Sequence, residues 1–224
     1  MSGTASPAPR GWFITIEGPD GGGKTTQAER LVDHLASIGR TVHLTREPGG
    51  TWLGERLREV LLARTTDAAG ATTDPLTDAF LFNAARRQLV EEVVRPALLA
   101  GTTVVCARFA DSTLAYQGYG SGVPRDRLRT LADIATDGLS PDLTILLDIP
   151  VEAGLARKGP ADVTRFEAEF DLGFHRRVRD GFLALAAAAP GRFQIIDATA
   201  EVDAVAEAIA LAVAERLGPG PGTS

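Results

Sequence analysis

Apolar residues along the chain follow two patterns: short continuous runs, and longer segments in which they recur every three or four positions. The short runs are typical of strands buried on both faces, and the periodic segments are typical of amphipathic helices. Strands and helices that alternate in this way usually build a parallel sheet covered by helices on both faces, with ligands at the carboxyl ends of the strands. Strands are expected at 12–17, 41–45, 102–107, 143–149 and 193–197, and helices at 26–38, 52–62, 76–99, 124–136, 167–188 and 202–217.

A glycine-rich segment lies between the first expected strand and the first expected helix. Residues 18–25 read Gly-Pro-Asp-Gly-Gly-Gly-Lys-Thr and match the pattern G-x-x-x-x-G-K-S/T at every fixed position. Glycines let backbone N–H groups surround phosphate oxygens, and a helix N-terminus adds partial positive charge. Lys24 is expected to bind terminal phosphates, and the Thr25 hydroxyl is expected to bind Mg2+. The alternative is a plain surface turn, which the flanking strand and amphipathic helix argue against.

Length and composition limit the class of protein. The 224 residues suit one domain, at 12–217, with disordered tails at 1–11 and 218–224. The net charge of −6 gives no basic field of the kind that attracts nucleic acid or an anionic membrane. The single cysteine, Cys106, excludes an internal disulfide and is typical of a reducing compartment, and no apolar run approaches the ~20 residues of a membrane span. We therefore expect a cytoplasmic protein that binds neither nucleic acid nor membranes.

The segment Arg46-Glu47-Pro48-Gly49-Gly50-Thr51 follows the second expected strand. Pro48 and the two glycines predict a rigid bend close to the ligand edge of the sheet. Arg46 could bind a second phosphate there, or it could form a solvent-exposed ion pair with Glu47. The residues alone favour neither interpretation.

Two further segments carry side chains suited to a nucleobase. Phe82 and Arg86 are four residues apart in an expected helix and share one face, where a ring beside a guanidinium suits a flat, hydrogen-bonding base. Phe82 alone would more often be a core residue. Past the third expected strand, residues 108–120 combine polar and aromatic side chains at a density unusual for a plain loop, which favours a binding role.

Charged residues near the fourth expected strand suggest a metal ligand and a lid. Asp148 ends that strand, where it could hold Mg2+ through water or cap the next helix. Arg157, Lys158 and Arg165 flank a short glycine- and proline-containing segment. Such a segment can close over phosphates and supply the arginine that phosphoryl transfer requires, although a solubilising surface turn has the same composition.

As a set, these motifs make the chain resemble the bacterial thymidylate kinases from about 12 to 197. The resemblance implies an α/β P-loop nucleoside monophosphate kinase fold, in which helices cover both faces of a five-stranded parallel sheet and a short lid lies at about 157–166. It further implies a homodimer that transfers the γ-phosphate of ATP to dTMP, giving dTDP for dTTP biosynthesis, with Mg2+ as cofactor. The motifs are at 18–25, 46–51, 82–86, 111–118, 141–148 and 165–167.

The resemblance also implies roles for individual residues. Eukaryotic-type relatives carry an arginine where this chain has Gly21 and Gly22, so the catalytic positive charge is expected from Arg157 or Arg165 in the lid, besides Lys24 and Arg108. For ATP the implied residues are Gly18, Pro19, Asp20, Gly21, Gly22, Gly23, Lys24, Thr25 and Thr26, with Thr25 and Asp148 at the metal. For dTMP they are Arg46 and Arg108 at the phosphate, Asp20 near the 3′-hydroxyl, Tyr116 at the 2′ position, Phe82, Arg86 and Pro48 at thymine, and Ser112, Thr113 and Gln117 around them.

The chain departs from the family pattern at Ala107, where the family usually has an aspartate before the arginine. Three accounts are open: Asp148, Asp20 or Asp111 substitutes for the missing carboxylate, the enzyme is slow, or the chain is an altered copy. Because the other motif residues are present, we expect a working enzyme with a relocated acid. A second departure is in the lid, where residues 163–167 read Val-Thr-Arg-Phe-Glu and the family commonly has Asp-Arg-x-Glu.

Two alternative functions are open, and Ala107 is the feature that favours the first of them. One is a nucleotide-binding protein with weak or no kinase activity, and the other is a kinase for another deoxynucleoside or its monophosphate. Binding without turnover would identify the first. Turnover with a nucleoside or a purine monophosphate would identify the second.

Overall fold

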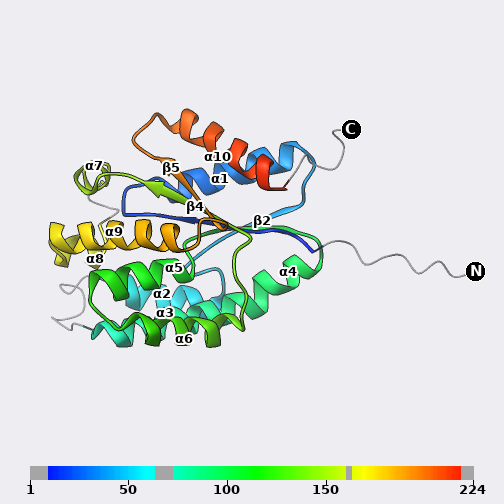
Figure 1. The fold of residues 1–224 in the computed structure, drawn as a ribbon. Helices are drawn as coiled ribbons and strands as arrows, with labels where there is room; N and C mark the ends of the chain where they lie inside the picture. The colour runs from blue at the N-terminus through cyan, green and yellow to red at the C-terminus, as the bar shows by residue number, and fades with distance from the viewer. Residues whose placement is uncertain (1–9, 64–72, 160–162, 218–224) are drawn as a thin grey trace, which may run out of the picture.

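The structure is a computed structural model that describes residues 10–63, 73–159 and 163–217. Its centre is one parallel sheet in the order β2-β3-β1-β4-β5 (Figure 1). This confirms the predicted α/β architecture and the positions of all five expected strands, with differences of at most one residue at either end. The strands are β1 (Phe13–Glu17), β2 (Val42–Arg46), β3 (Thr103–Ala107), β4 (Leu143–Asp148) and β5 (Phe193–Asp197).

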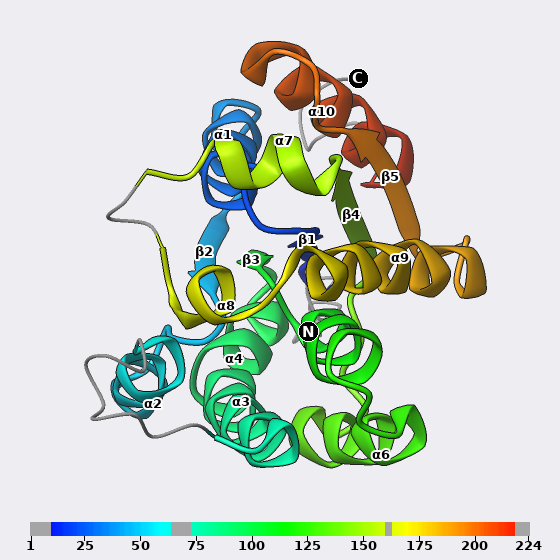
Figure 2. The ribbon, with the colours of Figure 1, turned by 90° about the vertical axis from the view of Figure 1, so that its left-hand side faces the viewer.

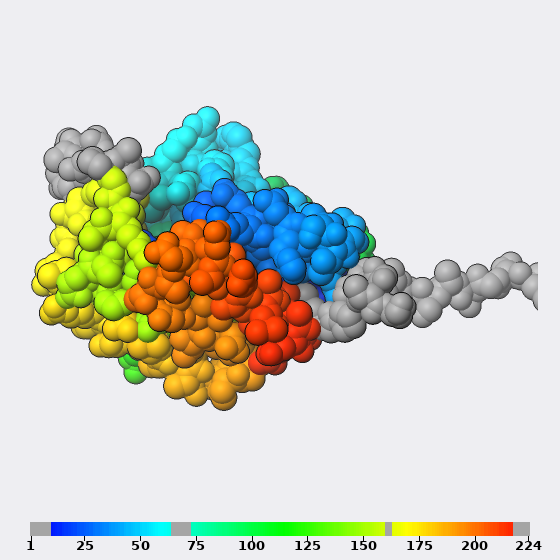
Figure 3. Space-filling view, turned by 90° about the horizontal axis from the view of Figure 1, so that it is seen from above, coloured from blue at the N-terminus to red at the C-terminus, as the bar shows by residue number. Residues whose placement is uncertain are grey.

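Helices connect the strands and cover both faces of the sheet. Helices α1 and α10 cover one face and lie side by side on the outer surface (Figure 3), while α3, α4, α6 and α9 cover the other (Figure 1). The helical elements are α1 (Lys24–Ser37), α2 (Trp52–Leu62), α3 (Pro75–Leu89), α4 (Arg95–Leu99), α5 (Ala110–Thr113), α6 (Arg125–Thr136), α7 (Val151–Ala156), α8 (Arg165–Glu169), α9 (Leu172–Ala188) and α10 (Val202–Leu217), with π-helical turns η1 (Val90–Val94) and η2 (Leu114–Gly120).

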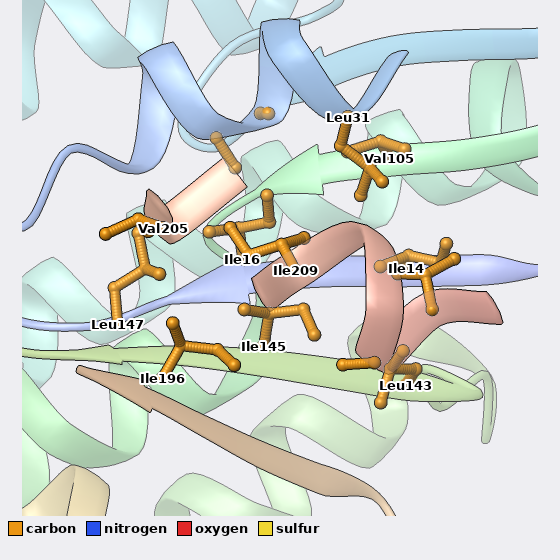
Figure 4. Close-up of a cluster of buried hydrophobic side chains, with 14 of the residues drawn as sticks. Ile14, Ile16, Leu31, Val105, Leu143, Ile145, Leu147, Ile196, Val205 and Ile209 are labelled. Atoms are coloured by element: carbon orange, nitrogen blue, oxygen red, sulfur yellow. The ribbon is translucent and has the colours of Figure 1, made fainter. Parts of the chain in front are cut away.

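The core between the sheet and helices α1 and α10 follows from the alternation of side chains along the strands. Ile14 and Ile16 of β1 point to this face, where they meet Leu31 of α1 and Ile209 of α10 (Figure 4). Phe13, which directly precedes Ile14 in the strand, points the other way and packs in a separate cluster on the opposite face. Burial on both faces explains why β1 reads as a continuous apolar run.

The start of the domain corrects one expectation. Residues 10 and 11 fall within the expected disordered tail, and both make contacts with the body of the domain. The Gly11 N–H donates to the Leu98 carbonyl at 2.8 Å, and Arg10 Nη1 lies 2.8 Å from an Asp142 carboxylate oxygen. A side chain at Gly11 would meet the Thr102 carbonyl oxygen at 1.9 Å, so only glycine fits. The rest of that expected tail and the one at 218–224 lie outside the described residues.

The carboxyl ends of the strands face the viewer in Figure 2, with α7 and α8 in front of them. The loops after β1, β3 and β4 all reach this edge, because the strands are parallel. No helix within the described ranges combines the length and apolar character that a membrane span requires.

Candidate active site

A pocket of about 850 Å³ lies at the carboxyl ends of the strands. Its walls come from the glycine-rich loop after β1, from α3 and η2, from the residues after α7, and from the segment between β5 and α10. The pocket therefore joins the expected phosphate loop to the expected base-binding residues. Sequence positions nearly 180 residues apart contribute to one cavity, as the parallel topology predicted.

The glycine-rich loop has the backbone that its sequence requires. Gly18, Gly21 and Gly23 have φ angles of 141°, 74° and 83°, which side chains rarely permit. A side chain at Gly21 would meet the Gly154 carbonyl oxygen of α7 at 1.8 Å. Gly23 is the N-cap of α1 and makes no side-chain cap, so the first N–H groups of the helix are available to an anion.

Lys24 begins α1 and folds back over the loop. Its Nζ donates to the carbonyl oxygens of Gly18 at 2.9 Å and Pro19 at 2.5 Å. Burial and the charge of Arg108 lower the pKa of Lys24 to about 7. Two neighbouring hydroxyl residues, Thr25 and Thr26, also line the pocket.

Asp20, Arg108 and Tyr116 form a hydrogen-bonded triangle that joins the phosphate loop to the segment after β3. Arg108 Nη2 lies 2.6 Å from Asp20 Oδ1, and the Tyr116 hydroxyl donates to Asp20 Oδ2 at 2.6 Å. Arg108 also donates to the Tyr116 oxygen at 3.2 Å and to the Ser112 hydroxyl at 3.2 Å. Burial raises the pKa of Asp20, but the charges of Arg108 and Lys24 outweigh burial and bring it to about 2. Asp20 is therefore an anion under all ordinary conditions.

Arg108 occupies a strained backbone position that its neighbours hold in place. Its φ is 70°, in the left-handed region that a side chain seldom adopts. Cys106 Sγ donates to the Arg108 carbonyl at 3.0 Å, and Glu17 accepts from the N–H of Phe109 at 2.7 Å and from the Ser112 hydroxyl at 2.6 Å. Burial and the charge of Asp111 raise the pKa of Glu17 to about 7. Sequence reasoning missed Glu17, although a charged residue ending an otherwise apolar strand was a visible signal.

Arg86 is fully buried at the base of the pocket. Its guanidinium pairs with Glu47 at 2.7 Å and donates to Asn83 Oδ1 at 2.7 Å, to the Thr113 hydroxyl at 3.0 Å and to the Phe109 carbonyl at 3.1 Å. Burial raises the pKa of Glu47, against the lowering effect of Arg86. The other expected base-site residues, Pro48, Phe82, Thr113 and Gln117, also line this pocket.

Five of the expected site residues are not among those that line the pocket: Gly18, Pro19, Arg46, Asp148 and Arg165. Arg46 has a half-exposed side chain that pairs with Glu55 at 3.1 Å. Arg58 of α2, which was not among the expected ligands, does line the pocket and donates to the Pro48 carbonyl at 3.0 Å. The sequence shows only that Arg58 shares a face of the expected helix with Gly54, and the burial of Gly54, which directs that face to the pocket, is seen only in the structure.

Asp148, the expected metal ligand, also lies outside the pocket lining. Its carboxylate receives two hydrogen bonds from Arg179, at 2.7 and 2.8 Å, and Asp111 is similarly paired with Arg192 at 2.6 Å. Of the three aspartates considered as replacements for the carboxylate missing at Ala107, only Asp20 lines the pocket.

The few acidic residues at the pocket suit a metal ion that is bound mainly by the phosphates of the nucleotide. Within the described part of the chain, no group of three or more His, Cys, Asp or Glu residues could hold an ion by itself. Mg2+ commonly binds through one or two protein oxygens, water and substrate phosphates, so the Thr25 hydroxyl and Asp20 carboxylate fit such an ion.

The lid residues have different environments. Arg157 and Lys158 line the pocket, where Arg157 donates to the Ala198 carbonyl at 2.8 Å and Lys158 pairs with Glu167. Arg165 is buried against Asp78 at 2.7 Å and is not among the lining residues. Residues 160–162 of the expected lid lie outside the described residues.

Comparisons with known proteins agree with this geometry. The family model of the thymidylate kinases matches residues 16–209. The thymidylate kinase of Thermomicrobium roseum is 51% identical over 206 residues, covering 91% of this chain and 95% of that protein. The thymidylate kinase of Deinococcus radiodurans is 50% identical over 210 residues, covering 92% and 98%. The crystal structure of thymidylate kinase from Ehrlichia chaffeensis superposes with a TM-score of 0.73 at 34% identity, covering 92% of this chain and 99% of that one. The chain belongs to the thymidylate kinase family.

Proposed function

We propose that the protein transfers the γ-phosphoryl group of ATP to dTMP and so forms dTDP. One observation carries the proposal: a single pocket joins a complete phosphate loop to the buried guanidinium of Arg86. The relatives at about half identity are named thymidylate kinases, which favours this acceptor over another nucleotide. The free thiol of Cys106 is consistent with action in the cytoplasm.

On the donor side, we assign the triphosphate to the loop at 18–26. The free N–H groups at the start of α1 would bind phosphate oxygens, and Lys24 would turn from the loop carbonyls to the terminal phosphates. Arg157 lines the pocket and would supply positive charge as charge develops on the transferring group.

We propose Mg2+ as the cofactor, held by the Thr25 hydroxyl and, through water, by Asp20. When bound, Mg2+ would neutralise part of the negative charge of the phosphates. Asp20 would then serve in place of the carboxylate missing at Ala107. Its low pKa supports this role, because it is ionised at any pH at which the enzyme works.

On the acceptor side, we assign the dTMP phosphate to Arg108 and Arg58, and thymine to Phe82 and Arg86. Asn83 takes one of the two hydrogens on Arg86 Nη1, and among the described residues the other has no acceptor, so it is available to the O4 atom of thymine. Tyr116 would crowd the 2′ position and disfavour a ribonucleotide. Phosphoryl transfer then needs positioning and charge stabilisation, with no covalent enzyme intermediate.

The proposal is tested by ADP release with ATP, Mg2+ and each of dTMP, dUMP, dCMP, dGMP and thymidine. The unmodified protein is compared with Ala107→Asp. We expect dTMP-dependent turnover in the unmodified protein and the weakest response to dGMP and thymidine. Turnover that appears only in Ala107→Asp would show that the chain binds nucleotides without useful catalysis. Faster turnover with dGMP or with thymidine than with dTMP would show that dTMP is not the acceptor.

A further inference from the structure

Three aromatic rings from different elements meet at the acceptor side of the pocket. Phe82 of α3, Tyr116 of η2 and Phe166 of α8 all line it. The Phe166 centroid is 5.7 Å from that of Tyr116, edge to face at 84°, and 6.3 Å from that of Phe82, with the rings tilted by 43°. Phe166 therefore adjoins the ring proposed to stack on the base and the ring proposed to crowd the sugar.

The residue before Phe166 anchors it from outside the pocket. Arg165 Nη2 lies 2.7 Å from Asp78 Oδ2, its Nε donates to the Leu61 carbonyl at 2.6 Å, and its Nη1 donates to the Thr73 hydroxyl. The side chain of Arg165 is 10% exposed and that of Asp78 is 5% exposed. Either partner alone would be a buried unpaired charge, and these contacts connect α8 to Asp78 of α3 and to the Leu61 carbonyl of α2.

The partner of Arg165 lies on the same helical face as the base-binding residues. Asp78, Phe82 and Arg86 follow one another at intervals of four in α3, which places all three on one face. One rigid helix thus fixes the proposed stacking ring, the proposed base-reading guanidinium and the anchor of Phe166. Helix geometry therefore sets the distances between Asp78, Phe82 and Arg86.

We propose that Phe166 is a wall of the acceptor base pocket and that the Asp78–Arg165 ion pair is the positioning element that holds it there. Arg165 then governs affinity and selectivity for a pyrimidine acceptor and does not contact the transferred phosphoryl group. The space beside the three rings fits a base with a single ring. Removing one of the three aromatic side chains should make the site large enough for a purine. This inference rests on the proposed function, since it takes the base to be thymine.

The test compares dissociation constants for dTMP and ATP by calorimetry, together with kcat and KM for dTMP and dGMP. Phe166→Ala should raise the Kd for dTMP about tenfold, because an aromatic contact is worth about 0.5–1.5 kcal/mol beyond its buried area. The Kd for ATP should stay the same. The ratio of kcat/KM for dTMP to kcat/KM for dGMP should fall. Asp78→Asn should act in the same direction with a smaller effect. The matched control is Arg56→Gln, which breaks an exposed α2 ion pair of 3.0 Å and should change neither constant.

Asp78→Asn leaves Arg165 buried without an anionic partner, so folding is checked by thermal unfolding. The double variant Asp78→Asn/Arg165→Gln removes both charges and completes a double-mutant cycle. If the two residues act as a unit, the double variant should raise the Kd for dTMP no more than either single variant.

Two results would overturn the proposal. The first is an unchanged dTMP Kd in Phe166→Ala. The second is a fall in kcat at unchanged dTMP Kd in Arg165→Gln, which would place Arg165 at the phosphates. An unmodified protein that does not bind dTMP would overturn this inference and the proposed function together, whereas normal dTMP binding by Phe166→Ala would overturn this inference alone.

Discussion

Arg86 has five N–H hydrogens, and most already have acceptors within the protein. Glu47, Asn83, Thr113 and the Phe109 carbonyl all bind its guanidinium, and the side chain is 1% exposed. An arginine held this tightly presents its remaining hydrogen in one direction, which suits discrimination between bases. A site built to hydrogen-bond a ligand rejects analogues that leave the bond unmade.

Removal of Arg86 should therefore affect stability as well as binding. Arg86→Ala leaves Glu47 buried without a partner, and breaking a buried pair from one side costs about 3–5 kcal/mol in the free energy of unfolding. Urea denaturation should show this loss. Arg86→Ala should also weaken dTMP far more than ATP.

The control separates these two effects. In Arg86→Ala/Glu47→Gln the unpaired charge is absent, so much of the stability should return while dTMP affinity stays low. Equal weakening of dTMP and ATP in this stable double variant would remove Arg86 from the base site.

Lys24 should make nucleotide binding depend on pH. Burial and Arg108 lower its pKa to about 7 from an ordinary value of 10.5, so above pH 7 the free protein holds this amine largely neutral. Bound triphosphate favours the charged amine and raises the pKa again. At a pH between these two values, ATP binding should take up about one proton per site.

Calorimetry in two buffers with different ionisation enthalpies measures this uptake directly. Lys24→Met is the control, because it keeps the length of the side chain and cannot be protonated. Equal proton uptake in both proteins would show that another group titrates.

At the scale of elements, the sequence predicted the five strands and most of the helices, because local apolar periodicity decides them. The single helix expected at 167–188 is instead two, α8 and α9, because Asp171 caps the start of α9 and accepts a hydrogen bond from the Phe174 N–H. The sequence also predicted the phosphate loop, whose residues are contiguous. The failures concern long-range partners: the sequence could not show that Arg46 turns to Glu55, that Asp148 pairs with Arg179, or that Arg165 packs on Asp78. Such pairs depend on side-chain directions across elements, which no local pattern specifies.

The phosphate loop and α7 approach each other closely enough to give a second element-scale prediction. A side chain at Gly21 would meet the Gly154 carbonyl at 1.8 Å, and one at Gly154 would meet the Asp20 carbonyl at 2.4 Å. Gly21→Ala should therefore displace the loop and raise the KM for ATP about tenfold or more, in line with strain of about 1–3 kcal/mol. A kinetic assay with ATP varied measures this.

Gly191→Ala provides the comparison, since a side chain there meets nothing within 4 Å. Its kinetics and stability should match those of the unmodified protein. A normal KM in Gly21→Ala would mean that the loop is not held against α7 during turnover.

At the scale of the whole molecule, the outer surfaces of α3 and α6 carry large apolar side chains. Phe80 of α3 is 56% exposed and Ile134 of α6 is 69% exposed, and the two helices pack together on one side of the sheet (Figure 1). Large apolar side chains left exposed on two neighbouring helices suit an interaction surface. We propose that a second copy of the chain covers them, so that the protein is a homodimer.

Phe80→Glu/Ile134→Glu should then give monomers, because a buried unpaired carboxylate opposes association. Light scattering after size exclusion measures the mass. Leu211→Glu, a 63% exposed position on α10 across the sheet, should leave the dimer intact. A monomeric unmodified protein would refute the proposed assembly, and a dimer that persists in the double variant would refute this surface.

The triangle of Asp20, Arg108 and Tyr116 links the two halves of the pocket, since Asp20 belongs to the phosphate loop and the other two belong to the acceptor side. A ligand that binds one of these three residues changes the electrostatic field at the other two and shifts their positions. ATP and dTMP should therefore bind cooperatively, and thermodynamic linkage requires each to alter the affinity of the other by the same factor. The order in which the two nucleotides arrive then affects the rate of assembly and leaves the stability of the ternary complex unchanged.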